Sequence, residues 1–97
     1  MPSVSTHVLD GAGGGPVEGV RVEVHDSEGR LVGSAVTDER GRAEEVAVGL
    51  PPGLYRLTWQ LSGFLSEVSA RVSLNEERRY HVPLLSSGHS AVVYLGV

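Results

Sequence analysis

The sequence predicts an all-β protein, an antiparallel two-layer sandwich of about eight short strands. Runs that alternate polar and apolar residues recur along the chain, separated by turn-forming residues every 8–12 positions or so. Valine, a β-branched residue, dominates the apolar positions, and no stretch repeats apolar residues at the spacing of an amphipathic helix. The expected strands are 5–10, 17–25, 31–37, 42–48, 54–61, 67–74, 78–85 and 89–97. Residues 1–97 are expected to form a single domain.

The first expected strand carries a histidine. Residues 5–10 read Ser-Thr-His-Val-Leu-Asp and alternate polar and apolar side chains around His7. The glycine-rich segment 11–16 ends this strand abruptly. The second strand, 17–25, alternates as well, and one of its faces is apolar. That face carries Val20, Val22 and Val24.

Turn signals separate the middle strands. Asp-Ser-Glu-Gly at 26–29 and Asp-Glu-Arg-Gly at 38–41 are typical tight turns that end in glycine, and Leu-Pro-Pro-Gly at 50–53 is a third turn. Strand 54–61 gathers its large side chains on one face, and strand 67–74 alternates without interruption. The residues expected to point inward are Tyr55, Leu57, Trp59, Val68, Ala70, Val72 and Leu74.

The last two strands carry the second histidine of interest. Strand 78–85 contains His81, and Pro83 lies two positions further on. Proline cannot donate a hydrogen bond to a neighbouring strand, so Pro83 predicts a sheet edge or a bulge. Residues 86–88 are Ser-Ser-Gly and lead into the final strand, 89–97.

Composition excludes several classes of function. The net charge is −4 and no strand has a basic face, so nucleic acid is not an expected partner. No apolar run is long enough to cross a membrane, and the N-terminus lacks the regions of a signal peptide, so a cytoplasmic protein is expected. The chain has no cysteine and no lysine, which excludes disulfides, thiolate nucleophiles and Schiff-base chemistry.

Three segments resemble one known family. They are 5–10, Ser-Thr-His-Val-Leu-Asp; 37–42, Thr-Asp-Glu-Arg-Gly-Arg; and 80–85, Tyr-His-Val-Pro-Leu-Leu. Over nearly its whole length the chain resembles the transthyretin-like proteins. The two histidine motifs are similar to those of the 5-hydroxyisourate hydrolase branch, because the hormone-carrying branch lacks both histidines.

This resemblance implies a transthyretin-like (prealbumin-like) sandwich that forms a homotetramer, with active sites in channels between dimers. The implied reaction is hydrolysis of 5-hydroxyisourate to 2-oxo-4-hydroxy-4-carboxy-5-ureidoimidazoline in urate catabolism, without a metal or cofactor. The implied catalytic residues are His7, Arg42, His81 and Tyr94, and the implied substrate-binding residues are Arg42, Tyr94, Leu95, Gly96 and Val97.

These residue types suit the opening of a cyclic amide by water. Histidine titrates nearest neutrality, so either His7 or His81 could accept a proton from water. The other histidine, or the hydroxyl of Tyr94, could donate a hydrogen bond to the developing oxyanion. Arg42 offers planar, two-pronged contacts to the carbonyl groups of a urate-like ring.

Two departures from the family pattern leave an alternative open. The enzymes typically end in Tyr-Arg-Gly-Ser, whereas this chain ends Tyr94-Leu-Gly-Val, which predicts weaker catalysis. A more apolar channel would instead suit a non-enzymatic binding protein for a small hydrophobic ligand. The connection 60–64 is also short, because relatives usually carry a longer segment with a short helix there. This second departure is expected to be structural and remote from the histidines.

The sequence does not favour a functional role for the remaining two histidines, nor a third class of function. His25 and His89 are expected at the surface, and their spacing does not predict a zinc site. An accessory sandwich of a surface or adhesion protein would need an export signal, and none is visible at the N-terminus.

Overall fold

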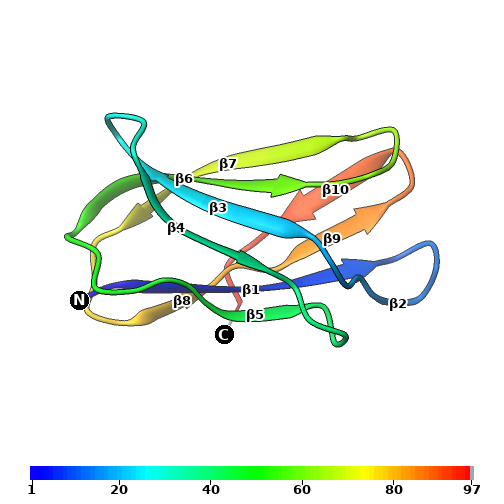
Figure 1. Ribbon diagram of the computed structural model, residues 1–97, viewed down its shortest axis with the longest axis horizontal. Coiled ribbons are helices and arrows are strands. Elements are labelled where there is room, and N and C mark those ends of the chain that lie inside the picture. The colour runs from blue at the N-terminus through cyan, green and yellow to red at the C-terminus, as the bar shows by residue number, and fades with distance from the viewer. Residues whose placement is uncertain (97) are drawn as a thin grey trace.

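The computed structural model describes residues 1–96, which fold as a sandwich of two β-sheets (Figure 1). The all-β fold class predicted from the sequence is confirmed. The strands are β1 (Ser3–Asp10), β2 (Gly15–Pro16), β3 (Arg21–Asp26), β4 (Leu31–Val36), β5 (Arg42–Ala47), β6 (Gly53–Gln60), β7 (Glu67–Leu74), β8 (Arg79–His81), β9 (Leu84–Ser87) and β10 (Ser90–Val93).

The two sheets are built differently. One sheet has the order β4-β3-β6-β7, and each neighbouring pair is antiparallel. In the other sheet β1 runs through the middle, with β5 and β2 along one edge and β8 and β9 along the other. β10 pairs with β9 and forms the outer strand. β1 therefore contacts four strands and sets the position of each.

The core lies between the sheets because successive side chains of a strand point to opposite faces. The predicted inward faces of β3 and β6 are confirmed, since Val22, Val24 and Leu57 are fully buried. Trp59 is also fully buried, and its Nε1 donates a hydrogen bond to Oγ1 of Thr6 on the facing sheet, 3.0 Å away. A buried indole N–H needs such an acceptor, so this bond fixes how the two sheets face each other.

The strand directions differ from the sequence prediction at one place. β8 and β9 both pair with β1 in parallel, whereas a wholly antiparallel sandwich was expected. The expected strand 78–85 is also divided, because Val82 and Pro83 interrupt it. The interruption is where Pro83 predicted an edge or a bulge. Val82 stays attached to β1, since its N–H donates to the carbonyl of Ser5 at 2.9 Å.

The outer strands leave apolar side chains in solvent. Leu31 and Val36 on β4 are about half exposed, as is Val92 on β10. Within residues 1–96, no helix is long and apolar enough to cross a membrane. After β10 the chain continues past Pro83 to the end of β8, where the N–H of Gly96 donates to the carbonyl of His81 (Figure 1).

Candidate active site

A pocket on the outer face of the β1 sheet collects most of the predicted site residues. Its volume is about 380 Å³, and we call it the histidine pocket. His7 and His81 line it together with Arg42 and Gly96. The other lining residues are Glu44, Arg78 and Arg79. The structure thus brings both predicted histidines and the predicted arginine to one place.

Strand alternation explains why these side chains share a face. Val4 and Thr6 of β1 point into the core. Ser5 and His7, the alternate residues, therefore point to the outer face of the sheet. His7 lies opposite Arg42 of β5 in the antiparallel pairing. Ser5 lies opposite His81 of β8 in the parallel pairing. Side chains opposite one another on one face of a sheet are close neighbours, so three adjacent strands supply the pocket.

Arg42 is placed by the turn that precedes it. Oδ1 of Asp38 accepts hydrogen bonds from the backbone N–H groups of Arg40, at 2.8 Å, and Arg42, at 3.0 Å. These two bonds lower the pKa of Asp38, the bond from Arg42 most, which keeps the carboxylate ionised. Gly41 completes the turn with a φ of +73°, and its carbonyl accepts from the N–H of Val8. The start of β5 is thereby tied to β1 beside His7.

One hydrogen bond of His7 shows which of its ring nitrogens carries a proton. Its Nε2 lies 2.9 Å from the carbonyl oxygen of Arg40. A carbonyl oxygen can only accept, so Nε2 of His7 is the donor. In the neutral ring the lone pair therefore lies on Nδ1.

His81 is held by a network that was not predicted from the sequence. Its Nδ1 lies 2.8 Å from Oγ of Ser5, and that oxygen also accepts a hydrogen bond from Nε of Arg79 at 3.0 Å. Arg79 in turn pairs with Glu44 on β5. Strand alternation could have indicated two of these residues. Ser5 and Arg79 each precede a site histidine by two positions, so each lies on the same face of its strand as that histidine.

The surroundings of His81 lower its pKa below the ordinary value for histidine. Partial burial is the largest cause, because it disfavours the charged ring. The positive charge of Arg79 is next, followed by His7 and, to a smaller extent, Arg42. The carboxylate of Glu44 opposes them. The neutral imidazole is therefore the dominant form of His81 near pH 7.

The C-terminal residues divide between two places. The N–H of Gly96 donates to the carbonyl of His81 at 2.7 Å, and a Cβ added at Gly96 would lie 2.8 Å from Cδ2 of the same ring. A residue with a side chain would therefore displace His81. Tyr94 and Leu95 are about half exposed and line a different pocket of about 360 Å³, beside β7. Within one chain they do not join the histidine pocket, and Val97 lies outside the described residues.

The other two histidines lie elsewhere. His25 on β3 is within 4.0 Å of Glu23, and His89 packs edge-on against Phe64 with ring centroids 5.2 Å apart. Among residues 1–96, no three His, Asp or Glu side chains are close enough together to hold a metal ion. The histidine pocket and its surroundings offer imidazole, guanidinium, carboxylate and hydroxyl groups.

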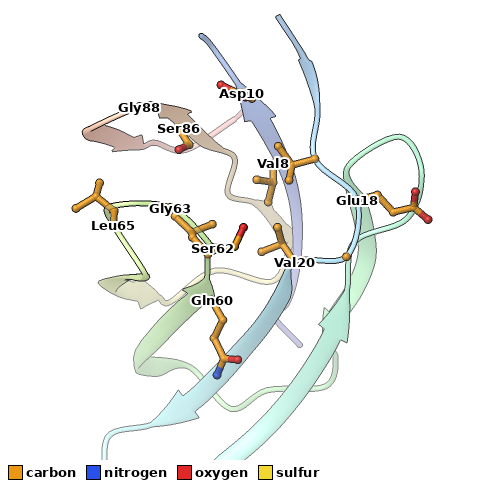
Figure 2. A pocket seen from close by; sticks show the side chains of 13 residues that line it. Val8, Asp10, Glu18, Val20, Gln60, Ser62, Gly63, Leu65, Ser86 and Gly88 are labelled. Atoms are coloured by element: carbon orange, nitrogen blue, oxygen red, sulfur yellow. The ribbon is translucent and has the colours of Figure 1, made fainter. Parts of the chain in front are cut away.

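A further pocket of about 370 Å³ lies where the short connection between β6 and β7 passes the end of β1. Figure 2 shows Asp10 and Ser86 at one end of this pocket and Gln60 at the other. Oδ1 of Asp10 is occupied by the backbone N–H groups of Ala12 and Gly13. No histidine lines it, so it offers no base for hydrolysis near neutrality. The connection between β6 and β7 lines this pocket, and none of its residues lines the histidine pocket.

Comparisons with known proteins agree with the sequence motifs. The family model described as the HIUase/Transthyretin family matches residues 4–96. The 5-hydroxyisourate hydrolase of Pseudomonas aeruginosa is 30% identical over 116 aligned positions, which cover 99% of this chain and 92% of that protein. That of Deinococcus radiodurans is 32% identical, covering 98% of this chain and 96% of that protein. The solved structure of Klebsiella pneumoniae 5-hydroxyisourate hydrolase superimposes with a TM-score of 0.89 at 27% identity, covering both chains fully.

Proposed function

Because the chain belongs to the HIUase/transthyretin family, we propose that it hydrolyses 5-hydroxyisourate in urate catabolism, using the histidine pocket. The observation that carries this proposal is the convergence of His7, Arg42 and His81 from three adjacent strands onto one outer face. The full-length similarity to several 5-hydroxyisourate hydrolases supports it. The product is 2-oxo-4-hydroxy-4-carboxy-5-ureidoimidazoline.

The pocket contains the groups that this hydrolysis needs. Water adds through its oxygen to a carbonyl carbon of the six-membered ring, and a histidine takes the proton that water loses. The carbonyl oxygen becomes an oxyanion and needs a hydrogen-bond donor, which the other histidine can provide. The ring C–N bond then breaks and the proton held by the histidine passes to the departing nitrogen. The carboxylic acid that forms loses its own proton to solvent and becomes a carboxylate. Arg42 can hold the flat, polar ring through paired N–H donors.

We further propose that the active unit is a homotetramer. The apolar side chains on the outer strands support this, as does the small core of a 97-residue chain. In such an assembly Tyr94 would complete a catalytic set with the two histidines and Arg42. Residues 94–97 would contribute to substrate binding, and the bond from Gly96 to His81 supports placing this segment near the pocket. A cytoplasmic location and the single-domain organisation also stay predictions.

The direct test is turnover of freshly prepared 5-hydroxyisourate, followed by the loss of its absorbance relative to buffer. The wild type should accelerate the reaction, and His7→Ala or His81→Ala should each lower kcat by about 10²–10⁴-fold. His25→Ala is the matched control, because His25 lies on the other sheet, and it should change little. Equal losses in all three variants would show a folding defect. If the wild type is no faster than buffer but a hydrophobic ligand raises its melting temperature, the proposed enzymatic function is wrong and a carrier function takes its place.

A further inference from the structure

Ser5 occupies the centre of the network around His81. Ser5 is fully buried. Its hydroxyl oxygen lies 3.0 Å from Nε of Arg79 and 2.8 Å from Nδ1 of His81. Glu44 pairs with the guanidinium of Arg79. Four side chains from three strands are therefore linked in the order Glu44, Arg79, Ser5, His81.

The bulge in β5 explains how Glu44 reaches this network. Val4 of β1 pairs with Ala47, whereas Thr6, two positions on, pairs with Ala43. Ser5 alone therefore lies opposite three residues of β5, one of which is Glu44. A bulge of this kind redirects side chains locally. Here it accompanies the pairing of Glu44 with Arg79, which holds the guanidinium against Ser5.

The positions of the protons in this hydrogen-bond network follow from which groups can donate and which can accept. The Nε of an arginine is always protonated and can only donate, so Oγ of Ser5 is an acceptor toward Arg79. The hydroxyl has one proton of its own, and burial keeps that proton from water. The remaining hydrogen-bond partner of Oγ within residues 1–96 is Nδ1 of His81, so the proton points there and Nδ1 bears a lone pair.

We infer that Ser5 is a positioning residue that holds His81 in the neutral tautomer with its proton on Nε2. In this state both ring nitrogens of His81 are committed: Nδ1 accepts from Ser5, and Nε2 carries a proton that it can donate. His81 then has no lone pair with which to take a proton from water. The positive charge of Arg79 nearby also opposes a second proton on the ring.

This inference rests on the proposed function and divides the work between the two histidines. His7 becomes the base, and its lone pair is on Nδ1 because Nε2 donates to the carbonyl of Arg40. His81 becomes the donor, through Nε2–H, to the oxyanion that forms when water adds to the ring carbonyl. His7 takes the proton from water and returns it to the ring nitrogen as the C–N bond breaks. The imidazole of His81 keeps its proton throughout.

Nitrogen-15 NMR of the uniformly labelled wild type tests the inference directly, without substrate. At pH 7.5, Nδ1 of His81 should give the signal of an unprotonated ring nitrogen and Nε2 that of a protonated one. The reverse assignment would overturn the inference, whatever the activity of the enzyme. Because this measurement uses the native chain, it does not depend on any variant folding.

Two serine variants extend the test to catalysis. Ser5→Ala should let the Nδ1–H tautomer of His81 become populated and should lower kcat by about tenfold, the effect of one hydrogen bond, with KM changed less. Ser5→Thr, which keeps the hydroxyl, should restore the tautomer. Ser69→Ala is the control, because it also removes one side-chain hydrogen bond, to Thr58 at 3.0 Å, but on the other sheet.

The two arms of the experiment separate this inference from the proposed function. If His81 shows the expected tautomer but the wild type does not accelerate hydrolysis, the proposed function fails and the role of Ser5 in holding the ring stands. If the wild type is active and Ser5→Ala leaves both the tautomer and kcat unchanged, the inference fails and the proposed function stands.

Discussion

At the scale of single residues, His81 should make the stability of the fold depend on pH. Its pKa in the folded protein is lowered, chiefly by burial and by Arg79, whereas an unfolded histidine titrates near 6.5. As the pH falls below about 6.5, the unfolded state therefore binds a proton before the folded state does. The free energy of unfolding should decrease over this window and level off below the folded pKa.

Thermal unfolding at a series of pH values from 7.5 to 5 measures this effect. The melting temperature of the wild type should fall further over this pH range than that of His81→Gln, because glutamine binds no proton at this position. The difference between the two proteins isolates His81 from the other titrating groups. A wild type whose melting temperature rises relative to His81→Gln on acidification would show that the sign of the pKa shift is wrong.

The altered C-terminus gives a second prediction for single residues. A charge-assisted hydrogen bond from an arginine is worth roughly 1.5–3 kcal/mol, or about 10- to 150-fold in rate if it acts in the transition state. If residues 94–97 reach a histidine pocket in the proposed tetramer, Leu95→Arg combined with Val97→Ser should raise kcat/KM by about that factor. Leu95 is half exposed, so the longer side chain has room. A double variant with unchanged kcat/KM would show that weakened catalysis was the wrong expectation.

At the scale of elements, alternation of side chains predicts a large part of this fold. The expected strand 67–74 coincides with β7, and the expected apolar face of β6 is the face buried in the core. Alternation succeeds here because each strand has one buried face, which fixes which side chains point outward. The family resemblance, rather than alternation, implied that His7 and His81 belong to one site, and both line the histidine pocket.

Other features depend on pairing, which alternation does not encode. Side chains alternate between the two faces of a strand whichever way its neighbour runs, so the parallel pairing of β8 and β9 with β1 was not predicted. The bulge in β5 is likewise set by the neighbouring strand. The pairing of Glu44 with Arg79 lies at this bulge, and alternation alone does not predict it. Tyr94 was expected at the histidine pocket, but within one chain it lies beside β7.

The turn before β5 gives a prediction that compares two glycines. Gly41 and Gly29 both have positive φ, +73° and +84°, so alanine at either position is strained by about 1–2 kcal/mol. They differ in space: a Cβ at Gly41 would lie 2.4 Å from the carbonyl oxygen of Val8, whereas nothing lies within 4 Å of one at Gly29. Gly41→Ala should therefore destabilise the protein by about 1–3 kcal/mol more than Gly29→Ala.

Urea unfolding of the two variants measures that difference. Because Gly41 also holds the start of β5 against β1, its variant should misplace Arg42 and lower kcat/KM as well. Gly29→Ala should leave kcat/KM close to the wild-type value, since the turn at 26–29 is far from the histidine pocket in the chain and lies on the other sheet. Equal stability of the two variants would mean that the chain around Val8 moves freely to make room.

At the scale of the whole molecule, the outer strand β10 has the features of an interface. Val92 is 53% exposed, whereas its neighbours Ala91 and Val93 pack against the core. β10 also leaves one edge without a strand partner among residues 1–96. An apolar edge strand readily pairs with another chain, and natural monomers usually protect such an edge with charge. β10 itself, Ser90–Val93, contains no charged residue.

We therefore expect wild-type protein to sediment as a species of about 41 kDa, four chains of 10.3 kDa each, at micromolar concentration. Val92→Glu should shift it to smaller species, because a carboxylate at a pairing edge would be buried without a partner. Turnover should fall with the loss of assembly if the active sites lie between dimers. Val48→Glu provides the control: Val48 is 60% exposed and lies in the connection after β5, so the same change should leave the sedimentation coefficient unaltered. A monomeric wild type, or a tetramer that tolerates Glu at position 92, would exclude β10 as the assembly edge and with it the channel proposed for Tyr94.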